Sequence, residues 1–270
     1  MGENGHHILI AIIRSGLQLD MNHRERVEAC REVSQRLLRT YYHDITATAV
    51  VGSVARMEDL EHSDIDFHVL VREGSSLRSH SFILNNCLFS VNVRTESEWR
   101  RELTEGGNHL PLAIGSLMTI LPAHDPTGSF ARLKNIALNV PVSAWKNGVR
   151  EGIAGIFEDF GRLRNLYAAQ NWDGFRMLKG FVAADMALTY ANLRRKVLRS
   201  EKDLSNVFEE EGDVQTEAAR AFRVAAGLDP AEDVYVMEAL EFLAGFLVRE
   251  AMKQSEMPLM LKSGRNYTAP

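Results

Sequence analysis

A sharp turn between a buried strand and the start of a helix is the feature of this sequence that most restricts its fold. Residues 45–51 are all small or β-branched and predict a buried strand, which ends at Gly52 and Ser53, where the backbone must turn. Backbone N–H groups and the positive end of a short helix point outward at such a junction, together with the Ser53 hydroxyl. The sequence therefore predicts a seat for phosphate oxygens at Gly52 and Ser53.

Two aspartates follow this turn. Asp64 comes twelve residues after Gly52, and Asp66 comes two residues later. Because side chains alternate faces along a strand, we expect both carboxylates to point the same way while the apolar residues between and after them hold the other face. Two carboxylates this close repel each other, and a hard divalent cation is the usual compensation. Mg²⁺ prefers one or two carboxylates together with phosphate oxygens, so Asp64 and Asp66 predict a magnesium site.

The combination of phosphate seat and acid pair indicates metal-assisted phosphoryl or nucleotidyl transfer. An Asp-x-Asp tripeptide alone is common and is more often an ordinary turn with a solvated strand end. The longer pattern is more specific. Residues 51–53 (Val-Gly-Ser) followed by residues 63–67 (Ser-Asp-Ile-Asp-Phe) resemble the signature of the DNA polymerase β-type nucleotidyltransferase superfamily.

This resemblance implies roles for individual residues. Asp64 and Asp66 would hold Mg²⁺ against a nucleoside triphosphate, and Gly52 and Ser53 would grip the leaving phosphates. Arg56 or Ser63 would assist them. For Arg56, a solvent-exposed helix residue without a role in binding is an equally good interpretation.

Composition narrows the class of protein. The chain has 270 residues and a formal net charge of -5 at pH 7, which argues against binding to nucleic acid, since such proteins usually carry a basic stripe. Cys30 and Cys87 lack the spacing of a metal site or disulfide framework, so we expect a reducing cytoplasm. No apolar run approaches the roughly 20 residues that span a membrane. Residues 1–20 lack a clear cleavage site for a leader peptide.

The first half of the chain mixes helices and strands. Asn22 with Glu25, and Thr95 with Glu98, have the spacing of capping boxes, which mark helix starts. Residues 85–86 (Asn-Asn) tolerate the positive φ angles of a tight hairpin. The expected elements are helices over 22–42, 95–103 and 130–138, the motif strands over 45–51 and 64–71, and hairpin strands over 81–84 and 87–93.

From residue 141 onward the sequence has nearly continuous helical periodicity and no strand signal. We expect helices over 142–170, 174–199, 217–227 and 230–254, the second of them capped by Asp173. That second helix is apolar on most sides, which predicts a position at the centre of a bundle. The sequence therefore predicts an α+β protein: a nucleotidyltransferase domain over 1–140, with a mixed β-sheet and flanking helices, followed by an all-α helical bundle over 141–270.

Within the superfamily, residues 22–170 are similar to the bacterial kanamycin (aminoglycoside) nucleotidyltransferases. Residues 157–165 (Phe-Glu-Asp-Phe-Gly-Arg-Leu-Arg-Asn) look like that family's Phe-Glu-x-x-Gly-Lys-x-Arg-Asn stretch. The likeness implies that Glu158 is the base that takes the proton from the acceptor hydroxyl, and that Arg162 lies near the nucleotide phosphates. Without the flanking match, Glu158 would be interpreted as a surface helix residue. The likeness also implies a homodimer whose sites combine the acid pair of one chain with the base of the other.

One position departs from the superfamily pattern. A third carboxylate usually comes from a strand beside the Asp-x-Asp strand, and the position that should hold it here is Ser90. Asn92 would share its face. Because neither is an anion, we expect one metal position of a two-metal mechanism to bind more weakly. Glu96, Glu98 or Glu158 are alternatives for the missing charge.

These observations predict an enzyme that moves a nucleoside monophosphate from ATP or another NTP, with adenylyl transfer favoured, onto a hydroxyl of a small molecule. The acceptor class that the resemblance implies is an aminoglycoside antibiotic, which would make the protein a resistance enzyme. The alternative is a nucleotide-binding regulatory or antitoxin-like protein with weak or no transferase activity. A toxin-type ribonuclease is disfavoured because the helical half contains no histidine; the last one in the sequence is His124.

Overall fold

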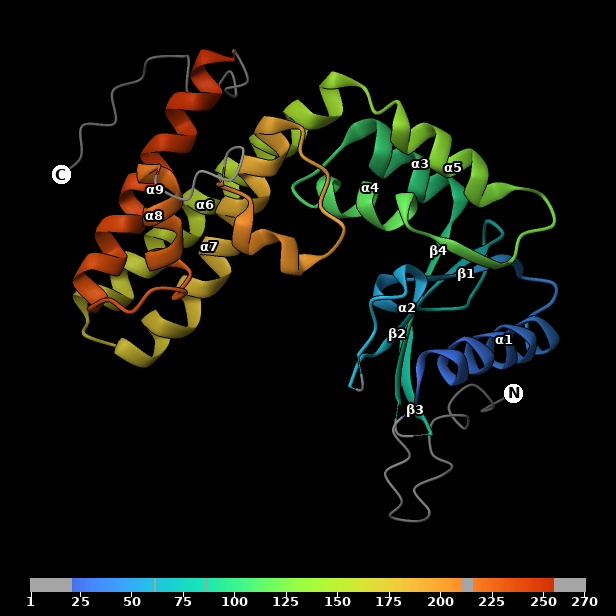
Figure 1. The fold of residues 1–270 in the computed structure, drawn as a ribbon. Helices are drawn as coiled ribbons and strands as arrows, with labels where there is room; N and C mark the ends of the chain where they lie inside the picture. The colour runs from blue at the N-terminus through green and yellow to red at the C-terminus, as the bar shows by residue number, and fades with distance from the viewer. Residues whose placement is uncertain (1–20, 61, 86, 210–215, 255–270) are drawn as a thin grey trace, which may run out of the picture. The chain divides into compact units, whose positions relative to one another are not determined.

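The computed structural model describes residues 21–60, 62–85, 87–209 and 216–254. Residues 1–20, which contain no clear cleavage site, lie outside this range. The fold is α+β, as predicted, with a mixed five-stranded sheet and a helical C-terminal region (Figure 1). The chain forms two compact units. One comprises the described residues up to 100 together with 116–137, and the other comprises 101–115 and the described residues from 138 onward.

The sheet of the first unit has the order β3-β4-β2-β1-β5. Only β2 and β4 run parallel; the other three neighbouring pairs are antiparallel, which makes the sheet mixed. The two motif strands predicted from the sequence, β1 and β2, lie side by side within it. The strands are β1 (Ile45–Val51), β2 (Ile65–Val71), β3 (His80–Leu84), β4 (Cys87–Thr95) and β5 (Leu121–His124).

Helix α1 (His23–Thr40) covers one face of this sheet (Figure 1). It begins where expected: the Asn22 side chain accepts a hydrogen bond from the Glu25 N–H, and the Glu25 carboxylate accepts one from the Asn22 N–H. Its apolar residues pack with Ile65, Phe67 and other buried residues of the sheet. This burial fixes which face of β2 remains for polar groups.

Two further sequence predictions in this region are confirmed. Strands β3 and β4 form a hairpin closed by the pair Leu84 and Cys87, and Asn85 takes a positive φ of 50°; residue 86 lies outside the described range. Helix α3 (Glu96–Glu105) starts with the second capping box, in which the Thr95 N–H donates to Glu98 Oε2 at 2.8 Å. The other helices in this half of the chain are α2 (Gly52–Arg56), which follows β1, α4 (Leu110–Met118), which precedes β5, and α5 (Ser129–Leu138), which follows β5.

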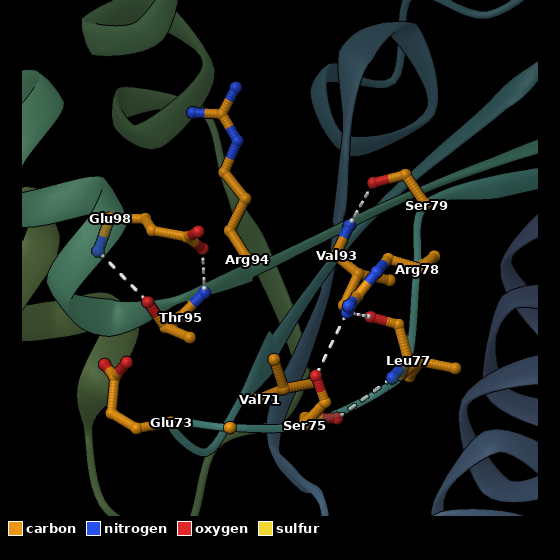
Figure 2. A pocket seen from close by; sticks show the side chains of 11 residues that line it. Val71, Glu73, Ser75, Leu77, Arg78, Ser79, Val93, Arg94, Thr95 and Glu98 are labelled. Carbon is orange, nitrogen blue, oxygen red and sulfur yellow. Dashed lines mark hydrogen bonds between the residues drawn. The ribbon is translucent and has the colours of Figure 1, made fainter.

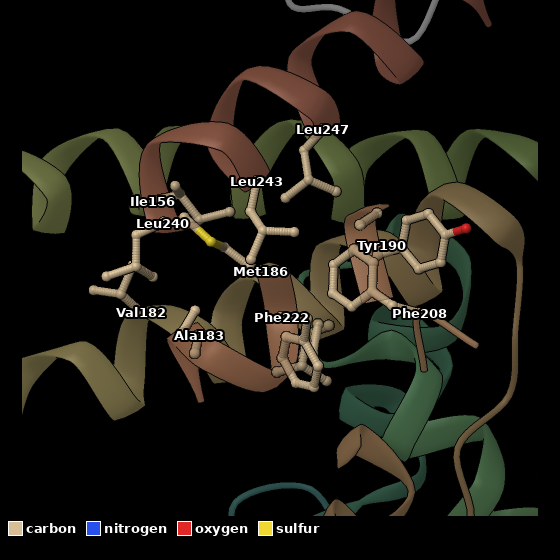
Figure 3. Packing of buried hydrophobic residues seen from close by; sticks show 14 of the residues in the cluster. Ile156, Val182, Ala183, Met186, Tyr190, Phe208, Phe222, Leu240, Leu243 and Leu247 are labelled. Carbon is tan, nitrogen blue, oxygen red and sulfur yellow. The ribbon is translucent and has the colours of Figure 1, made fainter. Parts of the chain in front are cut away.

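The second unit packs around helix α7 (Trp172–Arg194), whose buried residues include Val182, Met186 and Tyr190 (Figure 3). As expected for a central helix, α7 contacts three other α-helices of the unit. Its neighbours are α6 (Val142–Ala168), the 3₁₀ helix η1 (Glu201–Asn206), α8 (Glu217–Ala225) and α9 (Asp233–Lys253).

The ends of α7 differ from the sequence prediction. The helix is capped by Asn171, whose side chain accepts from the Gly174 N–H at 3.0 Å, and Asp173 lies inside the first turn. Both residue types cap helices well, so the sequence leaves the start ambiguous by two residues. The helix ends at Arg194 instead of 199, because Arg195 turns to a left-handed conformation with φ 51°.

Each of the two units is built from two separate segments of the chain, so no single boundary divides them. Residues 101–115 group with the residues after 138, so α3 and α4 each contribute to both units. The predicted domains 1–140 and 141–270 stay a prediction. Among the described residues, no helix combines the length and the apolar character needed to cross a membrane.

Candidate functional site

The turn after β1 has the geometry that its sequence predicts. Val51 is extended, Gly52 takes a φ of 72°, and the short helix α2 begins there. A positive φ is costly for residues with a Cβ atom, so glycine suits this position. Ser53 lies half-buried in the first turn of the helix. The strand, the turn and the helix start therefore meet at Gly52 and Ser53.

Gly52 and Asp66 lie in close contact. Val51 pairs with Asp66 across the antiparallel strands β1 and β2, which brings the turn beside the carboxylate. A Cβ atom added to Gly52 would lie 2.7 Å from Asp66 Oδ2. A larger residue at position 52 would therefore displace this carboxylate, in addition to straining the backbone. The turn that is predicted to bind phosphate therefore lies directly against one member of the acid pair.

The acid pair alternates with buried residues as expected. Ile65 and Phe67 are fully buried against α1, whereas Asp64 is exposed and Asp66 is half-buried. Strand β2 begins at Ile65, so Asp64 lies just before it. A cation at this pair would be reached from solvent through Asp64. The close approach of the Gly52 backbone to the Asp66 carboxylate fits a site for Mg²⁺ and phosphate oxygens.

Strand β4 brings Ser90 to the side of Asp66. The parallel register pairs Asp66 with Ser90 and His68 with Asn92, so these four side chains share one face of the sheet. Ser90 thus occupies the neighbouring-strand position expected from the sequence, and it is neutral. Within the described ranges, no three His, Cys, Asp or Glu side chains are grouped so that they could hold a metal ion. A cation held by Asp64 and Asp66 would therefore need phosphate oxygens or water molecules as its other ligands.

His68 lies on the same face as Asp66 and is not predicted from the sequence. Its side chain is buried, with the residue 8% exposed, and its Nε2 lies 2.7 Å from Ser116 Oγ. Its ring meets that of Trp99 edge-on, with the centroids 5.0 Å apart. Burial, helped by the positive charge of Arg94, lowers the pKa of His68 to about 4, so the ring is neutral at pH 7. Side chains alternate faces along β2, so a residue two positions after Asp66 shares its face. This pattern could have identified His68 from the sequence.

The loop between α2 and β2 is anchored by an ion-pair cluster that no sequence motif indicates. Asp59 accepts from Arg26 Nη1 at 3.0 Å and lies 2.6 Å from His23 Nδ1, and its side chain is only 1% exposed. Burial alone would raise the pKa of Asp59, but the hydrogen bonds from His23 and Arg26 outweigh it and lower the pKa. The cluster ties this loop to α1. It joins residues more than 30 positions apart, which no local pattern predicts.

Arg56 and Ser63, which the sequence predicts to assist phosphate binding, both form hydrogen bonds to residues near them in the sequence. Arg56 Nε donates to Glu58 Oε2 at 2.8 Å, and the Arg56 side chain is 10% exposed. The Ser63 hydroxyl accepts from the Leu60 N–H at 2.8 Å and so closes the loop before the acid pair. In the described conformation both side chains support the loop. A role in phosphate binding stays a prediction for each.

Glu158 and Arg162, the predicted base and phosphate ligand, lie on α6 in the second unit. Arg162 donates to Glu158 Oε1 at 2.5 Å and to Asp159 Oδ1 at 2.8 Å. The Glu158 and Arg162 side chains are 68% and 62% exposed. The structure brings these two residues together as an ion pair one helical turn apart. Their catalytic roles stay predictions.

A cavity of about 570 Å³ lies elsewhere in the first unit, at the carboxyl ends of β2 and β4 (Figure 2). It is not lined by the turn or by the acid pair. Polar groups in and beside it are already bonded: the Ser97 hydroxyl donates to Glu73, and Glu98 accepts from the Thr95 N–H. In Figure 2 the Arg94 side chain extends away from the loop carrying Glu73 and Ser75. This cavity is therefore separate from the predicted site.

Comparison with known proteins gives two curated relatives, both aminoglycoside nucleotidyltransferases (4'), one from Staphylococcus aureus and one from a Bacillus species. Each is 26% identical over 147 residues, which is 54% of this chain and 58% of the relative. The match thus spans a little over half the length of these relatives. No protein-family model matches the chain.

A solved structure, a nucleotidyltransferase-like protein from Exiguobacterium sibiricum, shares the fold. It aligns with a TM-score of 0.51 over 88% of this chain and 82% of its own, at 14% identity. At that identity the likeness concerns the fold alone. Together the relatives and the fold confirm the resemblance to nucleotidyltransferases that was drawn from the Gly-Ser turn and the acid pair.

Proposed function

We propose that this chain is a magnesium-dependent nucleotidyltransferase that moves a nucleoside monophosphate, with AMP from ATP favoured, onto a hydroxyl of a small molecule and releases pyrophosphate. The observation that carries the proposal is the contact of Gly52 with Asp66, where a Cβ atom would lie 2.7 Å from Oδ2. This contact brings a turn suited to phosphate oxygens and a carboxylate suited to a cation within reach of one substrate. The sequence relatives support the same reaction class.

In this mechanism the first unit binds the nucleotide. Asp64 and Asp66 would hold Mg²⁺ against the triphosphate, where the cation neutralises the charge that grows on the departing pyrophosphate. The backbone N–H groups at Gly52 and the Ser53 hydroxyl would bind oxygens of the leaving phosphates. The ion-pair cluster at Asp59 would keep the intervening loop in place, so that turn and acid pair keep their spacing.

The second unit would supply the base. Glu158 would accept the proton of the attacking hydroxyl, which a positioned carboxylate can do with a gain of about 10²- to 10⁴-fold in rate. In the described conformation Glu158 is paired with Arg162. We propose that Arg162 turns to the nucleotide phosphates when substrate binds, which would free Glu158 to act as a base. We also propose a homodimer, in which the base of one chain serves the acid pair of the other.

The acceptor that we propose is an aminoglycoside. The names of the two sequence relatives support this class. Aminoglycosides are polycations, and the formal net charge of -5 would favour their approach. Transfer to a hydroxyl of the antibiotic would inactivate it and confer resistance.

Transfer can be tested by incubating the chain with Mg²⁺, each of the four labelled nucleoside triphosphates and a panel of aminoglycosides. We expect pyrophosphate release that requires an acceptor, and a product heavier than the acceptor by one nucleoside monophosphate. The variant with both Asp64→Asn and Asp66→Asn is the control and should give neither. The same panel should include hydroxylated compounds of other classes. Transfer to one of these and to no aminoglycoside would support the reaction but contradict the proposed acceptor.

A second candidate is a nucleotide-binding regulatory protein with weak or no transfer. The neutral Ser90 beside Asp66 favours it, because the site has one fewer anion to hold a second metal. The same panel separates the two functions. Nucleotide binding that depends on the acid pair, without pyrophosphate release for any acceptor, would favour the regulatory protein.

A further inference from the structure

Four polar side chains form a block on one face of the sheet, beside the acid-pair site. Asp66 and His68 come from β2, and Ser90 and Asn92 come from β4. The parallel register places Ser90 opposite Asp66 and Asn92 opposite His68, so the block is two residues wide and two residues long. We call these four residues the polar block. Its Asp66 and Ser90 end reaches the predicted metal site, and its His68 and Asn92 end is covered.

The covered end holds two polar atoms that lack a hydrogen-bond partner among the described residues. They are His68 Nδ1 and Asn92 Oδ1, and both atoms are buried. The His68 ring cannot easily turn to find a partner, because its Nε2 is bonded to Ser116 Oγ and the ring packs edge-on with Trp99. The position of Nδ1 is therefore fixed by two contacts on other elements.

Buried polar atoms without a partner are costly and uncommon, and two that belong to opposite residues of neighbouring strands call for a shared explanation. One water molecule would satisfy both. It can donate to Asn92 Oδ1 with one hydrogen, and at His68 Nδ1 it can either donate or accept, so the arrangement works in both tautomers of the ring. Buried waters are held in this way by polar groups that otherwise lack partners.

We propose that His68 and Asn92 hold one buried water between them, and that they act as positioning residues for the Asp66 carboxylate at the other end of the polar block. The inference rests on the proposed function, since it gives the acid pair a metal to bind. Groups behind a metal ligand fix its orientation, and their loss typically costs about 10- to 100-fold in metal affinity. His68 and Asn92 would have this effect without contacting the metal or substrate.

The direct test is a high-resolution crystal structure of the full wild-type chain. We expect an ordered water within hydrogen-bond distance of both His68 Nδ1 and Asn92 Oδ1. A structure in which these atoms have no shared water would overturn the proposal, whatever the activity of the protein. This measurement needs no variant and no bound metal.

The positioning role is tested by Mn²⁺ titration, followed by electron paramagnetic resonance without nucleotide. We expect His68→Leu and Asn92→Leu to weaken Mn²⁺ binding about 10- to 100-fold, and His68→Asn, which keeps a polar atom near the place of Nδ1, to restore most of it. Thr48→Val is the matched control. Thr48 is also buried and polar and belongs to the same sheet, but it bonds to Ser34 of α1 at 2.6 Å, so its loss should leave Mn²⁺ affinity unchanged.

Equal Mn²⁺ affinity in wild type and in a folded Asn92→Leu variant would overturn the positioning role. If the leucine variants do not fold, His68→Ala and Asn92→Ala carry the test, because each removes the polar atom with less crowding and should still weaken Mn²⁺ binding about 10- to 100-fold. Failure of the proposed function looks different: Mn²⁺ binding would then be insensitive to Asp64→Asn and Asp66→Asn as well.

Discussion

Asp66 Oδ2 lies 2.7 Å from the point where a Cβ atom of residue 52 would be, so Gly52 and Asp66 cannot be varied independently. Two separate costs meet at this glycine. One is the positive φ of 72°, which any L-residue would have to adopt, and the other is displacement of a carboxylate that we assign to the metal site. A glycine with a similar positive φ but no neighbouring carboxylate can separate the cost of the backbone from the cost of displacing Asp66.

We predict that Gly52→Ala destabilises the fold and also abolishes nucleotide transfer. Gly128→Ala is the matched control, because Gly128 has a similar φ of 69° and no atom within 4 Å of the place its Cβ would take. Both variants should lose about 1–2 kcal/mol of unfolding free energy from the left-handed backbone. Urea unfolding measures that loss, and steady-state kinetics should show a large fall in turnover for Gly52→Ala alone. Equal activity of the two variants would contradict the assignment of the turn.

The acid pair gives a second prediction. Asp64→Asn combined with Asp66→Asn should remove transfer and weaken Mg-ATP binding while leaving the fold intact, because Asp64 is exposed and Asp66 is only half-buried. Surface substitutions usually change stability by less than about 0.5 kcal/mol. Isothermal calorimetry measures the affinity, and circular dichroism checks the fold. Unchanged Mg-ATP affinity together with persistent turnover would show that the motif is wrongly assigned.

We predict that substitution of Ser90 changes the metal dependence, because the register of β4 places this residue opposite Asp66. Ser90→Asp should shift the activity titration to lower Mg²⁺ or Mn²⁺ concentrations, because it adds an anion opposite Asp66. Without metal, repulsion between the carboxylates should raise the pKa of one of them. Ser81→Asp is the control, since Ser81 pairs with Ser90 on the edge strand β3 and adds the same charge one strand farther away. If neither variant shifts the metal dependence, Ser90 does not face the site.

The Asp59 cluster predicts a pH-dependent stability. The folded-state pKa of Asp59 lies below its ordinary value of 3.8, so its contribution is complete above that value and is lost as the pH falls through the folded pKa. Asp59→Asn removes a charged partner of the buried Arg26 and should cost about 3–5 kcal/mol at pH 7. The unfolding free energies of wild type and variant, measured in urea, should begin to converge as the pH falls below 3.8 and should meet below the folded pKa of Asp59. A difference that is the same at neutral pH and well below the folded pKa would contradict the assignment.

The elements that the sequence predicts well are those set by neighbours along the chain. The capping boxes at Asn22 and Thr95 involve residues three positions apart, and the hairpin at Asn85 is set by its turn, so each is evident locally. The position of Ser90 beside Asp66 is expected from the resemblance to the superfamily, and the parallel register of β2 and β4 agrees with it.

The features that the sequence does not predict depend on contacts between distant residues. Asp59 meets Arg26 across 33 positions, and His68 meets Ser116 across 48. Neither contact leaves a periodic or short-range signal, because burial of a polar residue is decided by what packs over it. The start of α7 is mispredicted for a different reason: Asn171 and Asp173 are both good caps, and only the hydrogen bond to Gly174 distinguishes them.

Substitution of Glu158 tests whether the second unit supplies the base. Glu158→Gln keeps the size of the side chain but cannot accept a proton, so turnover should fall about 10²- to 10⁴-fold while ATP binding is nearly unchanged. Glu241→Gln is the control, because Glu241 is also an exposed partner of an arginine, Arg164, at 3.0 Å. Rapid-quench kinetics with saturating ATP measures the chemical step. Full turnover in Glu158→Gln would exclude this residue as the base.

The proposed shared site has a further consequence for mixed dimers. A chain carrying Asp64→Asn and a chain carrying Glu158→Gln should each have little activity. A heterodimer of the two would nevertheless contain one site with both groups intact, because acid pair and base come from different chains. Mixing and re-equilibrating the two variants should therefore restore up to one active site per heterodimer. Sedimentation of the wild type checks that dimers form at the assay concentration. If dimers form and the mixture stays inactive, acid pair and base belong to the same chain, or Glu158 is not the base.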